Sequence, residues 1–130
     1  MVHALSSVKK WGGVVEDYLA IHEFMDSSKA VIADNRHRVL THNSWFIKVV
    51  LPRVFGVNGM IQNSQGKAVS VSDIGERHIL EDFRKKYIPT PQDYIENLQH
   101  QPWMDNGRGE GPPSAKKLRH RTKVINWRAE

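Results

Sequence analysis

The chain has 130 residues, 39% of them hydrophobic and 25% charged, which predicts a single globular domain with its own core. It contains no cysteine, so disulfides and thiolate metal sites are excluded, and a reducing cytoplasm is compatible with this composition. No run of about 18 apolar residues occurs and residues 1–13 lack the apolar core of a secretion signal, so we expect a cytoplasmic protein without a membrane span.

The net charge of +5 is concentrated at one end of the chain. Residues 1–107 carry equal numbers of basic and acidic side chains, whereas residues 108–130 carry seven basic and two acidic ones. The stretch NGRGEGPPSAKK, which begins at Asn106, is rich in glycine and proline and is typical of a linker. The sequence therefore predicts one globular helical domain over residues 1–104 and a basic, flexible tail over residues 105–130.

The first half of the domain is predicted to contain a long helix pair. Residues 1–13 are interpreted as an irregular arm before the first helix. That helix is predicted over residues 16–33, where apolar side chains follow an approximate helical stripe. A second helix is predicted over residues 34–54, in which Pro52 bends the helix or ends it early.

The second half is predicted to contain a β-hairpin and two shorter helices. The turn residues Ser64-Gln65-Gly66 lie between two strand-like runs, at residues 60–63 and 67–71, and indicate a hairpin. Helices are then predicted over residues 72–86 and 90–98 from their capping patterns. The predicted fold class is mainly α: a helical domain with a long helix pair, one β-hairpin and two shorter helices.

Potential metal ligands concentrate between residues 21 and 45, and a second group lies at residues 76–82. Neutral imidazoles and carboxylate oxygens are the usual ligands of Zn²⁺, Mn²⁺, Fe²⁺ and Ni²⁺ where cysteine is absent. The candidate metal ligands are His22, His37, His42 and His78. Because His37 and His42 are about 140° apart around a helix, both can face one site only if the helix is distorted or the site lies between elements.

The leading functional hypothesis is a small metal-binding protein that hydrolyses a phosphoester or a nucleotide. His78 shares a helix face with Glu81 and Asp82, and either acid would be a ligand or the general base. The residues predicted to neutralise an anionic substrate are Lys29, Arg36 and Arg38. A structural network, in which the histidines hydrogen-bond to nearby acids, is the open alternative. His3 and His100 are interpreted as incidental.

The basic tail supports a second hypothesis from a different class. The residues predicted to contact nucleic acid or a partner are Lys116, Lys117, Arg119, Arg121, Lys123, Trp127 and Arg128. Cations that neutralise phosphates, together with an indole that stacks on bases, suit nucleic acid. In this hypothesis the chain is a non-enzymatic interaction protein, of a phage accessory or host-takeover type, that binds nucleic acid or an acidic protein surface. A solvated tail and a homo-oligomer are further open alternatives.

Several short motifs occur in the order and spacing of a known family. They include His3-Ala4-Leu5-Ser6-Ser7, Asp34-x-Arg36-His37-Arg38, Ile74-Gly75-Glu76-x-His78-x-x-Glu81-Asp82 and Pro102-Trp103-Met104. On these motifs the chain resembles, from His3 to Met104, a family of short bacterial and phage proteins classed as a domain of unknown function. The resemblance implies one shared site and no established activity. Its members would be His22, Asp26, Lys29, His37, His42, Glu76, His78, Glu81 and Asp82.

Two features depart from the family pattern. Where relatives tend to have a short glycine-containing exit from the third helix, this chain has Phe83-Arg84-Lys85-Lys86-Tyr87. The tail after Met104 lies outside the resemblance, so a function that depends on the tail would be particular to this protein.

Overall fold

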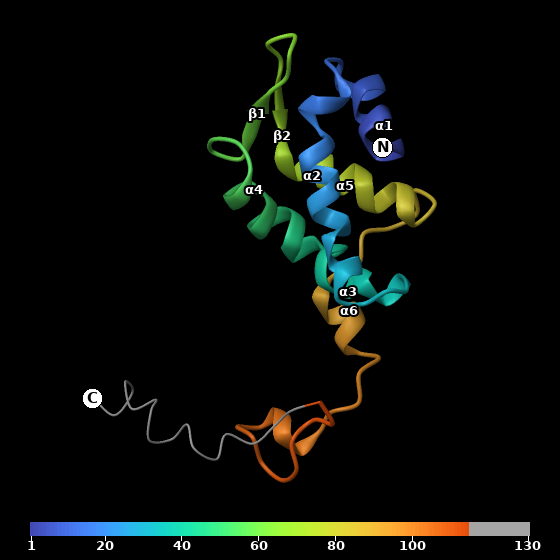
Figure 1. Cartoon of the computed structure of the whole chain (residues 1–130), viewed down its shortest axis with the longest axis vertical. Coiled ribbons are helices and arrows are strands. Elements are labelled where there is room, and N and C mark those ends of the chain that lie inside the picture. Colours follow the sequence, from blue (N-terminus) through green and yellow to red (C-terminus); the bar gives the residue numbers. More distant parts are fainter. Residues whose placement is uncertain (115–130) are drawn as a thin grey trace, which may run out of the picture. The chain divides into compact units, whose positions relative to one another are not determined.

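The computed structural model describes residues 1–114, which are mainly helical with one two-stranded hairpin, as the sequence predicts (Figure 1). Residues 1–97 form one compact unit, and the chain from Leu98 onward belongs to a second. The α-helices are α1 (Val2–Trp11), α2 (Leu19–Asp26), α3 (Arg38–Thr41), α4 (Leu51–Val54), α5 (Val71–Asp82) and α6 (Pro91–Ile95). The strands are β1 (Met60–Gln62) and β2 (Ala68–Ser70). None of the helices described is long and apolar enough to cross a membrane.

The segment Val2–Trp11 is a regular helix, so the prediction of an irregular arm there is wrong. Apolar side chains at Ala4, Val8 and Trp11 follow the i, i+4, i+7 pattern of a helix face, and Ala4 is fully buried. Gly12 ends the helix with a φ of 85°, a conformation that glycine adopts without steric cost. Because α1 packs against α2 and α5, its polar side chains reach the interior of the unit.

The second long helix predicted from the sequence is interrupted at His42 and Asn43. α3 ends at Thr41, and the side-chain oxygen of Asn43 then accepts a hydrogen bond from the backbone N–H of Phe46 at 2.9 Å. This contact satisfies a donor at the start of the next helical segment, as a cap does. That segment contains a π-helical turn directly before Pro52, which cannot donate to the α-helical pattern. The interruption leaves His42 in a turn rather than inside a helix.

The hairpin and the helix that follows it are confirmed. β1 and β2 pair antiparallel, with Met60 opposite Ser70. The Ser70 hydroxyl accepts a hydrogen bond from the backbone N–H of Asp73 at 3.3 Å, so α5 begins directly at the end of β2. α5 ends at Asp82, four residues before its predicted end.

α6 starts at the predicted cap and is tied to the rest of the first unit. The Thr90 hydroxyl accepts from the backbone N–H of Asp93 at 3.2 Å, and the Asp93 carboxylate accepts from the backbone N–H of Thr90 at 2.7 Å. The Tyr94 hydroxyl donates to the backbone carbonyl of His42 at 2.8 Å. α6 therefore supports the turn that contains His42.

The hydrophobic core lies where α2, the π-helical turn and α5 pack together. Its largest fully buried apolar side chains are Tyr18, Met25, Ile47, Leu51, Ile74 and Ile79. Gly75 lets α5 approach closely, because a Cβ atom there would lie 2.6 Å from Leu51 Cδ1 and 2.7 Å from Ile47 Cγ2. Both distances are well inside van der Waals contact. This packing fixes the position of α5 directly before His78.

The described part of the second unit is short. Residues Pro102–Met104 form a 3-10 turn, and the exposed side chains of His100 and Asp105 pair at 3.2 Å. The predicted domain boundary at residue 104 stays a prediction.

Candidate metal centre

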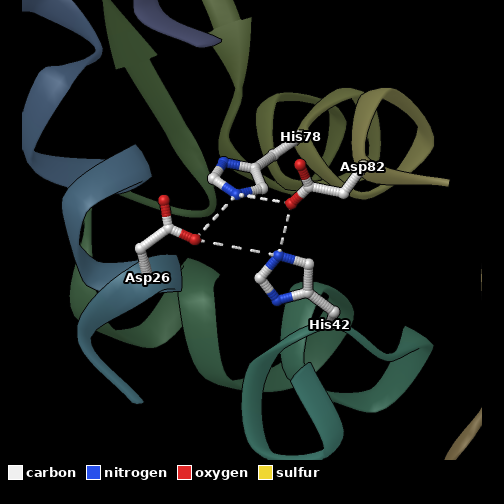
Figure 2. Close-up of side chains that lie close together, drawn as sticks. All are labelled: Asp26, His42, His78 and Asp82. Atoms are coloured by element: carbon white, nitrogen blue, oxygen red, sulfur yellow. Dashed lines mark hydrogen bonds and ion pairs between the residues drawn. The ribbon is translucent and has the colours of Figure 1, made fainter. Parts of the chain in front are cut away.

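Two aspartates and two histidines meet inside the first unit (Figure 2). Asp26 is the last residue of α2, His42 lies in the turn after α3, and His78 and Asp82 are one turn apart on α5. One potential ligand atom from each residue lies within 4.8 Å of all the others. Figure 2 shows carboxylates and imidazoles alternating around a small space. We call these four residues the Asp/His cluster.

The spacing of the four ligand atoms suits a single ion. His78 Nε2 lies 3.3 Å from Asp26 Oδ1 and 3.4 Å from Asp82 Oδ2. His42 Nε2 lies 2.8 Å from Asp82 Oδ2 and 3.9 Å from Asp26 Oδ1. A tetrahedral zinc ion with bonds of about 2.0–2.1 Å separates its ligand atoms by roughly 3.3 Å. Small side-chain adjustments would therefore place all four atoms around one ion.

Both aspartates of the cluster are ionised at neutral pH. The two histidine side chains are fully buried, while the side chains of Asp82 and Asp26 are 17% and 33% exposed. Burial alone would raise the pKa of Asp26, but a hydrogen bond with His78 holds that pKa at about 2. Burial opposes ionisation of Asp82 as well, yet hydrogen bonds with His3, His42 and His78 hold its pKa well below the usual range. The two aspartates therefore each contribute a negative charge to the cluster.

Each cluster histidine has one ring nitrogen, Nε2, that faces the aspartates (the inner nitrogen) and one, Nδ1, that faces away from them (the outer nitrogen). The outer nitrogen of His78 is hydrogen-bonded to a chain of buried polar groups. His78 Nδ1 lies 2.8 Å from His22 Nδ1, and His22 Nε2 lies 2.8 Å from the Ser7 hydroxyl. That hydroxyl donates to the backbone carbonyl of His3 at 3.2 Å, so it accepts from His22 Nε2. Burial lowers the pKa of His22 to about 3, so its ring is neutral and its Nδ1 is an acceptor. His78 Nδ1 is therefore the donor, and His78 Nε2 faces the two aspartates.

His42 has an equivalent arrangement. The Thr41 hydroxyl donates to the backbone carbonyl of Met25 at 2.6 Å, so it accepts from His42 Nδ1, which lies 2.9 Å away. Burial lowers the pKa of His42, although its hydrogen bond with Asp82 opposes this shift. The Nδ1 of His42 therefore carries the proton, and Nε2 faces Asp82.

Both inner ring nitrogens of the cluster thus point at carboxylate oxygens. A neutral imidazole with its proton on Nδ1 presents a lone pair at Nε2, and a lone pair against a carboxylate is repulsive. The contact requires a cation: either a second proton on each ring or a metal ion that all four atoms bind. Hydrogen bonding of the outer ring nitrogen is the usual arrangement around metal-bound histidines.

His3 covers the cluster from α1, so its interpretation as incidental is wrong. Its ring stacks on His78 with a centroid separation of 3.8 Å. Its Nδ1 lies 2.7 Å from Glu81 Oε1 and its Nε2 lies 3.2 Å from Asp82 Oδ1. Burial alone would lower the pKa of His3, but hydrogen bonds with Asp82 and Glu81 raise it. His3 therefore bridges two carboxylates, and Glu81 also accepts a hydrogen bond from Ser6.

The predicted ligands divide into two groups. The structure brings together His42, His78 and Asp82. It does not bring His22 or His37 into the cluster. His22 contacts the outer nitrogen of His78, and His37 Nδ1 instead lies 2.7 Å from the Ser28 hydroxyl. The rings of His37 and His42 still contact each other edge to face, with centroids 5.5 Å apart, so His37 packs beside the cluster without contributing a ligand atom to it.

Of the three residues predicted to neutralise an anionic substrate, two lie near the cluster and one does not. Lys29 Nζ lies 4.0 Å from the Asp26 carboxylate, and Arg38 Nη2 lies 3.8 Å from the Asp82 carboxylate. Arg36 instead pairs with the acid two residues upstream at 2.8 Å and is exposed. The predicted tail contacts lie outside the described residues: Lys116, Lys117, Arg119, Arg121, Lys123, Trp127 and Arg128.

Sequence reasoning missed the residues that orient the cluster, which are Ser7, Thr41 and His3. Ser7 and His3 are four residues apart and share a face of α1, and this spacing was the available signal. No local pattern marks Thr41, because its role depends on α2 packing against α3.

Residues 1–104 match the family described as "Domain of unknown function (DUF6915)". The match covers most of the chain, so the chain belongs to this family, and the predicted membership in a family of that description is confirmed. No curated protein and no solved structure matches the chain. A bacterial or phage origin of the relatives stays a prediction.

Proposed function

We propose that this member of the DUF6915 family binds one divalent transition metal ion through Asp26, His42, His78 and Asp82. The observation that supports the proposal is the direction of Nε2 in His42 and His78. Both Nε2 atoms face carboxylates, while the Nδ1 atoms are hydrogen-bonded to Thr41 and to His22. Two carboxylates and two neutral imidazoles carry two negative charges, which one divalent cation neutralises. Zn²⁺, Mn²⁺, Fe²⁺ and Ni²⁺ all accept this ligand set.

We further propose that the centre hydrolyses a phosphoester or a nucleotide. A divalent cation with a free coordination position polarises a phosphoryl oxygen and lowers the pKa of a water molecule. Four protein ligands fill a tetrahedral ion but leave two positions on a six-coordinate one. The hydrolase proposal therefore favours Mn²⁺, Fe²⁺ or Ni²⁺, whereas Zn²⁺ would favour a structural role.

The surroundings of Asp26 support access by an anionic substrate. Asp26 is the most exposed member of the cluster, and a cavity of ≈ 270 Å³ opens beside it. His3 and His22 line the same cavity. Lys29, whose side chain is 60% exposed, lies at the edge of the cluster and can reach a bound anion. In this proposal Asp82 is a ligand, and Glu81 positions His3 instead of acting as the general base.

The proposal is tested with full-length protein stripped of metal. Mn²⁺, Fe²⁺ under anaerobic conditions, Ni²⁺ and Zn²⁺ are titrated by calorimetry, and each loaded form is assayed with p-nitrophenyl phosphate and bis(p-nitrophenyl) phosphate. We expect one ion per chain and metal-dependent release of p-nitrophenol. His42→Asn should lose both properties. His37→Asn is the matched control, because His37 is equally buried but lies outside the cluster.

Two results would contradict the proposal in different ways. A folded protein that binds none of the four ions would reduce the cluster to a structural polar network. One ion per chain without hydrolysis of either ester would retain the metal centre and remove the hydrolase.

A further inference from the structure

Two adjoining cavities lie between α1 and the C-terminal end of α5. The first, of ≈ 530 Å³, is lined by the apolar Val2 and by the polar side chains of His3, Ser6, Glu81, Asp82, Arg84 and Lys85. The second, of ≈ 440 Å³, shares Val2, Ser6, Glu81 and Lys85 with the first and adds Leu5, Lys9 and Arg77. We call the two cavities together the α1–α5 groove. Because His3 and Asp82 line it, the groove borders the Asp/His cluster.

The groove has an excess of positive charge. Four cationic side chains line it, namely Lys9, Arg77, Arg84 and Lys85. Its two carboxylates, on Glu81 and Asp82, are already bridged by His3. Arg77 donates to the Ser6 hydroxyl at 2.9 Å and pairs with Glu81 at 3.4 Å. Among residues 1–114, the other three cations form no ion pair, so their charge faces the groove uncompensated.

Two of these cations occupy unusual backbone positions. Arg84 and Lys85 have φ angles of 59° and 61°, which lie in the left-handed region. Side chains rarely adopt this conformation, whereas glycine does so without steric cost. The chain thus presents two long cations, side by side, at positions where glycine would be less strained. Both residues line the first cavity of the groove.

We propose that the α1–α5 groove binds a ligand with consecutive phosphate groups. Four cations around two joined cavities match a ligand with several negative charges better than a ligand with a single one. Residues 77–82 of α5 alone advance by roughly 7.5 Å along the helix axis, which is longer than a single phosphate group. Asp82 lines the first cavity, and His3 lines both this cavity and the one beside Asp26, so the inference deepens the proposed hydrolase and rests on it for the substrate role. Binding itself does not require the metal.

The test measures binding to full-length, metal-stripped protein at low salt. The probes are ATP, a six-nucleotide single-stranded oligothymidylate and orthophosphate. Arg84→Gly combined with Lys85→Gly removes two cations and retains the backbone conformation. Arg53→Gln combined with Lys67→Gln is the matched control, because it removes the same charges from exposed residues outside the groove. Amide chemical shifts locate each probe on the protein.

We expect the glycine variant to bind ATP or the oligonucleotide at least tenfold more weakly, and the control to bind within twofold of the parent protein. For the oligonucleotide, the slope of log affinity against log salt should fall by about 0.7 for each lost cation. The thermal midpoint of the glycine variant should not decrease, because glycine relieves the left-handed strain. Shift changes should include Ser6, Lys9 and Arg77.

Equal losses in the glycine variant and the control, or shift changes confined to residues 115–130, would overturn the proposal. Orthophosphate binding as tightly as the other probes would overturn the requirement for consecutive phosphates. Preference between ATP and the oligonucleotide identifies the source of the phosphates. Comparison of the metal-stripped and the metal-loaded parent protein separates the two proposals: binding without metal supports the groove even if no metal centre exists, and binding that appears only after metal is added contradicts a groove that works without metal.

Discussion

Thr41 determines where the proton lies on His42, and Ser7 determines it on His22, which in turn accepts from His78 of the Asp/His cluster. Each hydroxyl donates to a backbone carbonyl and must therefore accept from an imidazole N–H. Outer contacts of this kind fix the orientation and the tautomer of a metal-binding histidine, and their removal typically lowers metal affinity by about 10–100-fold. Metal affinity is thus expected to depend on residues beyond the four ligands.

Ser7→Ala and Thr41→Val should each weaken metal binding by about 10–100-fold without changing the stoichiometry of one ion per chain. Both substitutions remove an acceptor for an imidazole N–H and leave every ligand in place. Calorimetric titration of the metal-stripped variants measures the effect. Ser27→Ala is the control, because the Ser27 hydroxyl is exposed and, within residues 1–114, bonds only to the backbone carbonyl of Phe24. Affinities equal to that of the control would show that the outer contacts do not orient the ligands.

At the residue scale, the sequence predicts some members of the Asp/His cluster but not which histidines lie together in it. Residue type predicts His42 as a ligand, and residue type together with spacing on a helix predicts His78 and Asp82. The structure places His22 against Nδ1 of His78 and His37 beside His42, where neither contributes a ligand atom, and it places His42 itself in a helix interruption capped by Asn43. Asparagine is a favoured helix cap, so Asn43 could have predicted the start of a new helix. The apolar pattern of residues 34–54 continues through this position, however, and predicts an unbroken helix.

Among the elements, α5 determines the geometry of the cluster because it carries two of the four ligands. Its approach to Ile47 and Leu51 depends on the missing side chain of Gly75. Gly75→Ala should destabilise the protein by about 1–3 kcal/mol, because the added methyl group overpacks the core. Urea denaturation measures the change. Glu76→Ala, on the same helix but outside this contact, should stay within about 0.5 kcal/mol of the parent protein. Equal stability of Gly75→Ala would contradict the tight packing of α5.

Asp17 joins the chain before α2 to the hairpin turn. Its carboxylate accepts from the backbone N–H of Val14 at 2.8 Å, and from the backbone N–H and the hydroxyl of Ser64 at 3.0 Å each. These bonds, the one from Val14 first, lower the pKa of Asp17 below its usual value of 3.8. A lowered pKa in the folded state contributes stability that is present above the unfolded pKa and is lost as the pH falls through the folded pKa.

Asp17→Asn should therefore destabilise the protein near neutral pH, and the difference from the parent protein should shrink as the pH falls below about 4. Urea denaturation at several pH values measures this difference. Glu23→Gln is the control, because Glu23 is exposed and its carboxylate has no hydrogen bond or ion pair within residues 1–114. A difference that does not change with pH would show that the charge of Asp17 is not involved.

Local signals predicted some elements well and others poorly. The hairpin and the start of α6 depend on turn and capping residues that act within a few positions, and both are confirmed. α1 was missed because its helical stripe of Ala4, Val8 and Trp11 is short and its other face is polar. That polar face is buried against α5 and the cluster, a contact that local reasoning does not contain.

At the scale of the whole molecule, the cluster depends on packing between segments that are distant in the chain. Its ligands come from the end of α2, the turn after α3 and the end of α5. Periodicity assigns each ligand to an element, but it does not say which ends of the elements meet. Asp26 joins His78 only because α2 packs across α5. The mainly helical fold class was predictable because periodicity is a local property of the sequence. The ligand set was not predictable, because it depends on contacts between distant segments.

Metal content is the measurement that tests the central proposal most directly. Untagged full-length protein, purified without chelators, is analysed by inductively coupled plasma mass spectrometry together with His42→Asn and His37→Asn. We predict close to one Mn, Fe, Ni or Zn per chain in the parent protein and in His37→Asn, and loss of that metal in His42→Asn. Folded parent protein without metal, whose thermal midpoint does not rise when any of these ions is added, would contradict the account.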